Sequence, residues 1–518
     1  MAAAQVLGSP ELLSLILQCF EEQHDEGDEL ERRENRLNRS TLATAARVDN
    51  IWFETATRVL WSFERGCPEL EILDNIEPVR REIYASKLTS ILIKDKSGQT
   101  PSILALSFPR RRTLCVGLVG KETGPSVLPI KQYLCPSIDF IDFWEWDEGF
   151  DKDLLTTIKF QCPRLRFLVL ETVDTHNTDI TPEDFNDFFC TKSLEFLRMS
   201  IESPLMSKSL FSTLGRMQTL RNLSITSYLS LRQIPEYIFS EGTSFFDNLE
   251  QVDLILEREA VQSAIVAIRH ASTVKLRIKS HVSARMAMFS DIKRMENLED
   301  LTLVFEGEDT TYVEGEDLCQ LGALKKLEFL VLRPADSEID IVRLLHFNDL
   351  DFQAMFAGLR RLHTLSWELT GLDLSVKTLI KLARNARFRN IFFRGSWDLQ
   401  GLSKYTGRLL FPNLRNLQLE RTVISGHKGN IPFKRIAENL LRHAPRLSNL
   451  TFDHDQNAKV HDTWKKLKKE KADWEAKNPP TIIYPPTDWT LILRKPSRVE
   501  TLKRREELGA LPQAPQDA

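Results

Sequence analysis

Residues that could carry out catalysis do not occur here at the spacings that known mechanisms require. The chain has no glycine-rich dinucleotide or phosphate loop, no zinc-protease motif and no serine-hydrolase elbow. The densest group of ligand-type side chains is FDHDQNAKVHD at 452–462, where His and Asp residues could bind a divalent metal. Polar capping residues are also expected there, at the end of the repeating pattern described below. We therefore predict no metal, no cofactor and no enzymatic activity of the chain itself.

Composition narrows the class of protein. The 518 residues are 42% hydrophobic and 27% charged with a net charge of −4, which argues against disorder throughout and against a chain-wide nucleic-acid footprint. No basic leader precedes the first apolar stretch, and no apolar run is long enough to span a bilayer. The seven cysteines include no CxxC pair, which favours reduced thiols. We expect a protein of the cytoplasm or nucleus, or both, that binds neither membrane nor nucleic acid.

A hydrophobic frame, Φ-x-x-Φ-x-Φ with Φ apolar, recurs along most of the chain. LCPSIDFIDF at 134–143 and QCPRLRFLVL at 161–170 carry it after the same Cys-Pro pair. Strong frames begin at Ile138, Leu165, Leu194, Leu220, Leu249, Leu298, Leu327, Leu362, Leu414 and Leu447. Weaker frames at Ala271 and Phe388 fill the two nearly doubled steps, and Leu88 and Arg111 begin plausible earlier frames.

Each frame predicts a short strand whose apolar side chains point to one face. The chain between frames must return to the next strand, and several returns have helical signals. At 180–189, Thr181 is expected to cap a helix that has Pro182 in its first turn. The pattern resembles the leucine-rich repeat family over roughly residues 85–455. The alternative is a set of unrelated α/β units that share a strand pattern.

Aromatic residues are aligned at the outward positions of successive frames. The third position holds Phe140, Phe167 and Phe196 in three consecutive frames, with Trp144 and Val169 beside them. A sparser second group contains Phe329, Val331 and Phe392. Two interpretations stay open: the side chains anchor a protein partner on the concave face, or the rings stack on each other or lie under the C-terminal tail.

The head of the chain, residues 7–63, follows a different pattern. Ser9, Pro10 and Glu11 are typical of a helix start, and the apolar residues that follow cover more than one helix face. One side should therefore pack internally while the other awaits a partner. A second helix follows Ser40, and Asp49 can cap a third. Between the first two lies an acidic insert, residues 21–39, which we interpret as solvated.

This head resembles an F-box, particularly that of fungal F-box proteins. The family docks on the Skp adaptor of cullin-based ubiquitin ligases. Asp49 stands where the family usually has Cys, and the loop after the first helix is longer than usual. The residues that the resemblance assigns to Skp binding are Pro10, Glu11, Leu12, Leu13, Ile16, Leu17, Phe20, Val48 and Trp52. The implied α/β fold is a three-helix F-box followed by an irregular leucine-rich-repeat solenoid, a horseshoe or arc.

Two segments complete the predicted organisation. Residues 64–84 are expected to form a helical connector, and the repeats extend over 85–455. Residues 456–518 are expected to form a basic helix with Trp464 and Trp474, a Pro-bounded cap strand and a disordered tail. The mixed charge of the helix is typical of an exposed helix rather than of a nucleic-acid site.

The functional expectation follows from both resemblances. They imply a non-catalytic substrate adaptor that acts as a monomer within the complex, with a Skp-type adaptor and, through it, a cullin as partners. The face that carries Phe140, Trp144, Phe167, Val169 and Phe196 would bind an unidentified protein substrate. The alternatives are a leucine-rich-repeat interaction scaffold without a ligase role, whose first helix is only a cap, and an enzyme without a known motif.

Overall fold

The structure is a computed structural model, and it divides into two compact units, Met1–His461 and Asp462–Ala518. The residues that it describes are 9–18, 40–62, 70–94, 100–117, 130–144, 151–173, 179–201, 205–236, 245–279, 288–307, 310–336, 341–385, 387–399, 401–405, 409–422, 433–452 and 458–477. Phe20, the acidic insert, the predicted cap strand, the C-terminal tail and Asp453 to Asp455 lie outside these residues.

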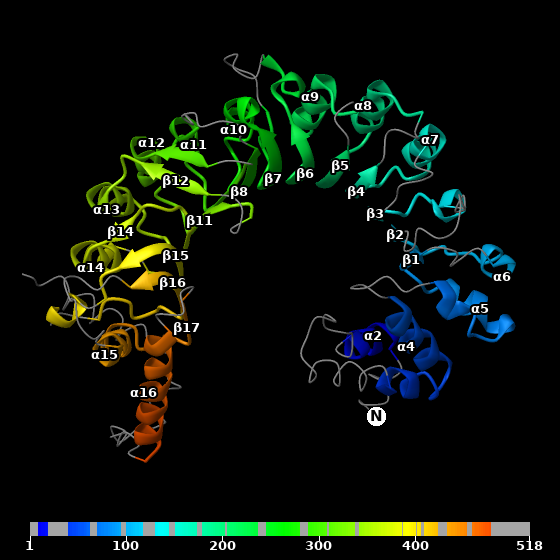
Figure 1. The fold of residues 1–518 in the computed structure, drawn as a ribbon. Coiled ribbons are helices and arrows are strands. Elements are labelled where there is room, and N and C mark those ends of the chain that lie inside the picture. The colour runs from blue at the N-terminus through cyan, green and yellow to red at the C-terminus, as the bar shows by residue number, and fades with distance from the viewer. Residues whose placement is uncertain are drawn as a thin grey trace, which may run out of the picture. The chain divides into compact units, whose positions relative to one another are not determined.

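The first unit is a mixed α/β structure built on one long parallel sheet, which does not close into a barrel. Its strands follow one another in chain order (Figure 1). They are β1 (Ser90–Lys94), β2 (Thr113–Gly117), β3 (Phe140–Trp144), β4 (Phe167–Val173), β5 (Phe196–Ile201), β6 (Asn222–Leu229), β7 (Gln251–Glu257), β8 (Thr273–Lys279), β9 (Asp300–Glu306), β11 (Phe329–Pro334), β13 (Thr364–Trp367), β15 (Asn390–Trp397), β16 (Asn416–Thr422) and β17 (Asn449–Phe452).

Every strand of this path begins two residues after the first residue of a hydrophobic frame. The weak frames behave like the strong ones: β8 follows Ala271, and β15 follows Phe388. Strand β8 shows why, because Val274, Leu276 and Ile278 are buried while the residues between them are half-buried. The period-two alternation of the sequence therefore sets which face of the sheet is covered.

The chain returns between strands through helices and irregular segments on one face of the sheet (Figure 1). Parallel strands joined in chain order need crossovers, and crossovers of one hand place every return on the same side. The helices of this layer are α6 (Pro101–Leu104), α7 (Lys152–Gln161), α8 (Pro182–Cys190), α9 (Lys208–Arg216), α10 (Val261–Ala267), α11 (Phe289–Ile292), α12 (Gly315–Cys319), α13 (Asp349–Gly358), α14 (Val376–Asn385) and α15 (Phe433–His443). The opposite face, which we call the open face, carries the outward residues of the frames.

Helix α8 illustrates how this layer is fixed. Thr181 Oγ1 accepts a hydrogen bond from the backbone N–H of Asp184 at 3.2 Å, and the Asp184 carboxylate accepts from the N–H of Thr181 at 3.1 Å. This reciprocal cap confirms the predicted helix start. Phe185, Phe188 and Phe189 are fully buried, and the last two rings meet edge to face at 5.1 Å. Burying each ring contributes about 1.5–3 kcal/mol.

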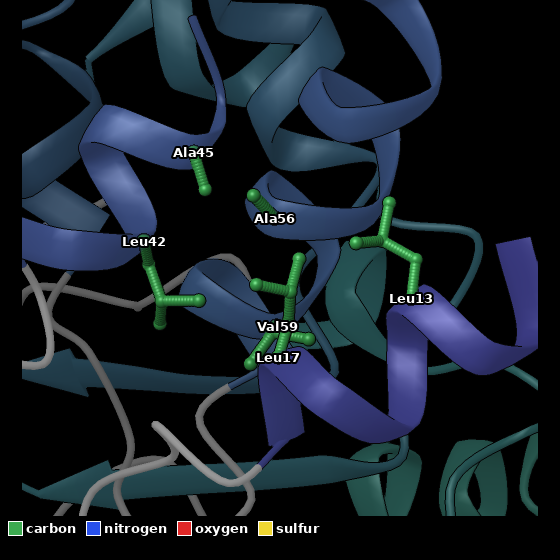
Figure 2. Close-up of a cluster of buried hydrophobic side chains, with 6 residues drawn as sticks. All are labelled: Leu13, Leu17, Leu42, Ala45, Ala56 and Val59. Carbon is green, nitrogen blue, oxygen red and sulfur yellow. The ribbon is translucent and has the colours of Figure 1, made fainter. Parts of the chain in front are cut away.

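The N-terminal helices form a small core of their own, shown in Figure 2. They are α2 (Pro10–Gln18), the helical residues 40–45 and α4 (Asn50–Ser62). The buried cluster consists of Leu13, Leu17, Leu42, Ala45, Ala56 and Val59. The Asp49 carboxylate accepts hydrogen bonds from the N–H groups of Ile51 and Trp52 at 2.8 and 2.9 Å, so it caps α4.

A connecting segment joins these helices to the sheet. It contains the 3₁₀ turn η1 (Leu70–Leu73) and α5 (Pro78–Ala85). Trp61 of α4 stacks on Tyr84 of α5 with ring centroids 4.9 Å apart, and Lys87 forms an ion pair with Glu54. The helical module is thus tied to the first strand through packed contacts.

Three short strands were not predicted. Strands β10 (Thr311–Glu314) and β12 (Val342–Leu345) pair with each other in a separate parallel sheet, and β14 (Asp373–Leu374) pairs with the end of β15. They lie in the returns between the predicted frames. Residues 369–374 (LTGLDL), which contain β14, and residues 339–344 (IDIVRL), which overlap β12, have the same Φ-x-x-Φ-x-Φ spacing but were not among the predicted frames. Among the described residues, no helix is long and apolar enough to cross a membrane.

Candidate protein-binding faces

The three predicted phenylalanines lie in one row across neighbouring strands of the open face. Phe140 pairs in register with Phe167, and Phe167 with Phe196. The rings of Phe140 and Phe167 are 6.3 Å apart, and the Arg166 guanidinium lies 5.4 Å from the Phe167 ring. All three side chains are half-buried. Stacking between rings therefore accounts for part of their burial, and the remaining ring surface is accessible.

Trp144 and Val169 have different environments from those predicted for a contact surface. A Cβ atom on Gly117 would clash with the indole of Trp144, so that ring lies directly against the β2 backbone. Val169 has only 8% of its surface exposed, because Asp142 and Arg198 stand in register on either side of it. Val169 therefore forms the floor of the surface, and its contact with a partner stays a prediction.

A carboxylate that the sequence interpretation did not single out stands at the centre of this surface. Asp142 lies between Phe140 and Trp144 on β3, and its register neighbours are Cys115 and Val169. Its Oδ1 atom is inaccessible to solvent and has no hydrogen-bond partner. Burial and the nearby Glu171 raise the pKa of Asp142 to about 6, against the opposing effect of Arg198.

The basic residues around this carboxylate are engaged with other acids. Arg198 Nε lies 2.8 Å from an oxygen of Glu171. Arg166 donates two hydrogen bonds to Glu195, at 2.7 and 2.5 Å. We call Phe140, Asp142, Trp144, Phe167 and Phe196 the β3–β5 surface, because they lie on these three strands of the open face.

The second aromatic group is more exposed and less continuous. Phe329 and Phe392 expose 41% and 37% of their surfaces. Val331 and Phe392 share a row but are separated by Ser366 of β13. In the neighbouring row, amide side chains bond to each other: Asn449 to Asn416 at 2.8 Å, and Asn416 to Asn390 at 2.6 Å. At this end of the open face, these polar side chains are therefore already hydrogen-bonded to one another.

Some of the residues predicted to contact a Skp adaptor are buried in the core of the N-terminal helices, and others are exposed. Leu13 and Leu17 are fully buried in the module's own core, and their contact with a partner stays a prediction. Leu12 and Ile16 on α2 are exposed, as are Glu11 and Val48, and Trp52 is half-buried. Leu15 and Ile51, which were not assigned to the contact, are also exposed, Leu15 to 62%. Of Pro10 only the helical backbone is described.

The exposed apolar side chains of the module lie outside its internal core. Leu12, Leu15 and Ile16 lie on the face of α2 that the internal core does not use, and Val48 and Ile51 flank the start of α4. We call these five residues the helical apolar surface. Apolar residues on both faces of a nine-residue helix are unusual for a helix that only caps a core.

Other chemistry is sparse in the described part of the chain. No group of three or more His, Cys, Asp or Glu side chains there could hold a metal ion. A cavity of about 340 Å³ lies between α10 and α11 and is lined by Ile265, Asp291 and Arg294 among others. Arg294 lies 3.5 Å from Asp291, and Arg269 donates a hydrogen bond to His270 at 3.1 Å. Several polar side chains that line the cavity are therefore bonded to one another.

Comparison with protein families and with curated proteins finds no match to this sequence.

Proposed function

We propose that this chain is a substrate-recognition adaptor of a Skp–cullin–F-box ubiquitin ligase. In this proposal the N-terminal helices are an F-box that docks the Skp adaptor, and the sheet and its returns are an irregular leucine-rich-repeat solenoid. The chain itself is non-catalytic, because it supplies proximity between a target and the transfer machinery. The observation that carries the proposal is the helical apolar surface, which lies beside the module's own filled core.

The second half of the proposal concerns the target. The β3–β5 surface presents half-buried aromatic rings on a face that the crossover layer leaves uncovered. Covering the remaining half of three rings would contribute roughly 2–4 kcal/mol before ordering costs. A protein target that also contacts neighbouring strands could bind there with micromolar affinity or better, on the order of −8 kcal/mol.

The docking step is tested by co-purification of the full chain with a Skp adaptor. The variant Leu15→Asp with Ile16→Asp places two charges on the helical apolar surface without touching the buried cluster. We expect recovery of the adaptor to fall at least tenfold, because desolvating each carboxylate at an apolar interface costs more than about 1 kcal/mol.

The matched control is Leu350→Asp, because Leu350 on α13 is 69% exposed and lies outside the module. It should leave adaptor recovery unchanged. Equal recovery by the double variant and the wild type would remove the F-box assignment. A chain that binds targets but no Skp adaptor would instead be an interaction scaffold without a ligase role.

A further inference from the structure

Asp142 occupies an environment that is unusual for a carboxylate on a sheet face. Its neighbours along β3 are two aromatic residues, Phe140 and Trp144, and its register neighbours are Cys115 and Val169. All four are side chains with little ability to solvate a negative charge. The raised pKa of Asp142 is the electrostatic consequence of this frame and of Glu171 on the next strand.

The neighbouring cations do not neutralise it. Arg198 lies two strands away and is bonded to Glu171, while Arg166 donates to Glu195 through Nε and Nη2. The two arginines are thus matched by two glutamates, and Asp142 is the surplus acid of the β3–β5 surface. Its buried Oδ1 atom has no hydrogen-bond donor, so the structure leaves the charge of this carboxylate poorly compensated.

We infer that Asp142, Phe140 and Trp144 form a receptor for a basic side chain, lysine or arginine, of the target segment bound on the open face. This inference rests on the proposed function, since it names the chemistry of the target at the same surface. An ammonium or guanidinium group would pair with the charge of this half-buried carboxylate from the open face. The aromatic residues on either side add attraction of a cation to their rings.

Charge complementarity selects this occupant over an apolar or acidic one. An apolar segment would cover Asp142 without supplying a donor, which increases the desolvation cost of the carboxylate. An acidic segment would meet Asp142 and Glu171 as like charges. A basic residue with apolar neighbours instead satisfies the carboxylate while its aliphatic stem packs against the rings.

The inference is tested with a displayed library of random dodecapeptides, selected on the full chain at pH 7.5. Peptides that bind the wild type should be enriched in Lys or Arg flanked by apolar residues. Asp142→Asn keeps the shape but removes the charge, and it should bind the selected peptides at least tenfold more weakly. Asp142→Lys should select peptides that carry Asp or Glu at the corresponding position.

Asp253→Asn is the matched control. Asp253 occupies the same row on β7, but it already has a partner, Lys275, at 2.6 Å. Its substitution should leave the affinity of the selected peptides unchanged. The inference is overturned if selection yields no preference for basic residues, or if Asp142→Asn binds the peptides as tightly as the wild type. In the second case, water satisfies Asp142 and the rings alone anchor the peptide.

The pH dependence of binding by the same peptides is an independent test. Because the pKa of Asp142 is about 6 and the group binds the cation only when ionised, lowering the pH from 7.5 to 5.5 should weaken binding. The ionised fraction falls roughly fourfold across this range, so the affinity should fall by about the same factor. Glu171 and Arg198 are the other charged groups that face this site. Asp142→Asn should abolish the pH dependence.

The outcomes for ligase role and target chemistry are separable. Loss of Skp adaptor binding with retained preference for basic peptides would leave the inference standing as a property of a scaffold. Retained adaptor binding without that preference would remove only the inference.

Discussion

At the scale of single residues, the most consequential buried charge is Lys192. Its side chain lies beyond the end of α8, and the ammonium donates to the carbonyl oxygens of Ile158, Lys159 and Cys162 at 3.2, 2.9 and 2.8 Å. These are among the last carbonyls of α7, so a lysine from the next return caps the helix before it. Burial lowers the pKa of Lys192 to about 8.

Replacing Lys192 tests this cap. Lys192→Met keeps the aliphatic volume but removes the three hydrogen bonds of the ammonium. The carbonyl oxygens of Ile158 and Cys162 keep backbone donors, whereas that of Lys159 loses the ammonium, and we expect a loss of about 1–3 kcal/mol in the free energy of unfolding. Urea unfolding followed by circular dichroism measures it. Lys131→Met is the control, because Lys131 forms only an exposed ion pair with Asp153 and should change stability by less than about 1 kcal/mol. Equal stability of the two variants would contradict the capping role.

The sequence could predict some residues of the candidate surfaces and not others. The row of Phe140, Phe167 and Phe196 followed from the frame, because outward positions repeat at a fixed place. Asp142 was not predictable, since its unusual state depends on neighbours from β2 and β4. The burial of Leu13 and Leu17 was not predictable, because apolar residues on every face of a helix give no sign of which face packs internally.

At the scale of elements, the frame predicted strands better than returns. Each strand of the path from β1 to β17 starts two residues after the first residue of its frame. This holds even where Arg111 replaces the first apolar residue. Arg111 is buried between the rings of Phe108 and Tyr133, 5.8 Å from each, so cation–π contact takes the place of an aliphatic side chain. Strand β10 was missed because its residues have no such frame. Strand β12 was missed because the frame that overlaps it, at 339–344, comes too soon after the frame at Leu327 to fit the repeat spacing.

Packing between returns depends on close approach at one glycine. A Cβ atom on Gly358, at the end of α13, would clash with the backbone carbonyl oxygen of Gly322 in the 3₁₀ turn η7 (Gln320–Ala323). The clash is with backbone, so it can be relieved only by moving the helix or the turn. Gly358→Ala should therefore destabilise the chain by about 2–3 kcal/mol, despite the better intrinsic helix propensity of alanine.

Thermal unfolding of this variant is the appropriate measurement. The control is Ala357→Gly, which changes helix propensity at the neighbouring position without adding an atom and should cost only about 1 kcal/mol. If Gly358→Ala is as stable as the wild type, then α13 does not pack as closely on η7 as described here.

At the scale of the whole molecule, length alone was misleading. A chain of 518 residues suggests several globular domains, yet the sheet path from β1 to β17 lies within one compact unit. The recurring hydrophobic frame instead predicts a continuous array of strands, which agrees with the single long sheet. The boundary between the two units, after His461, falls inside α16 (Ala458–Lys477). The amino-acid composition does not change at this point, so the sequence contains no sign of the boundary.

The topology makes a prediction about cooperativity. Each strand of the path pairs with its neighbours in the path, and β15 also pairs with β14, so stability should be approximately a sum of local and nearest-neighbour contributions. Leu417→Ala removes a buried side chain from β16 and should cost about 2–5 kcal/mol locally. Hydrogen exchange should accelerate in β15, β16 and β17 while β3, β4 and β5 keep their protection.

Exchange measured by mass spectrometry distinguishes this from global cooperativity. Arg415→Ala, which alters an exposed side chain just before the same strand, should leave the exchange pattern unchanged. An increase of similar size in all strands after Leu417→Ala would show that the unit unfolds as a single cooperative core. A local increase would mean that the β3–β5 surface keeps its geometry when the far end of the sheet opens. Peptide binding at Asp142 would then be insensitive to Leu417→Ala, because stability is transmitted only between neighbouring strands.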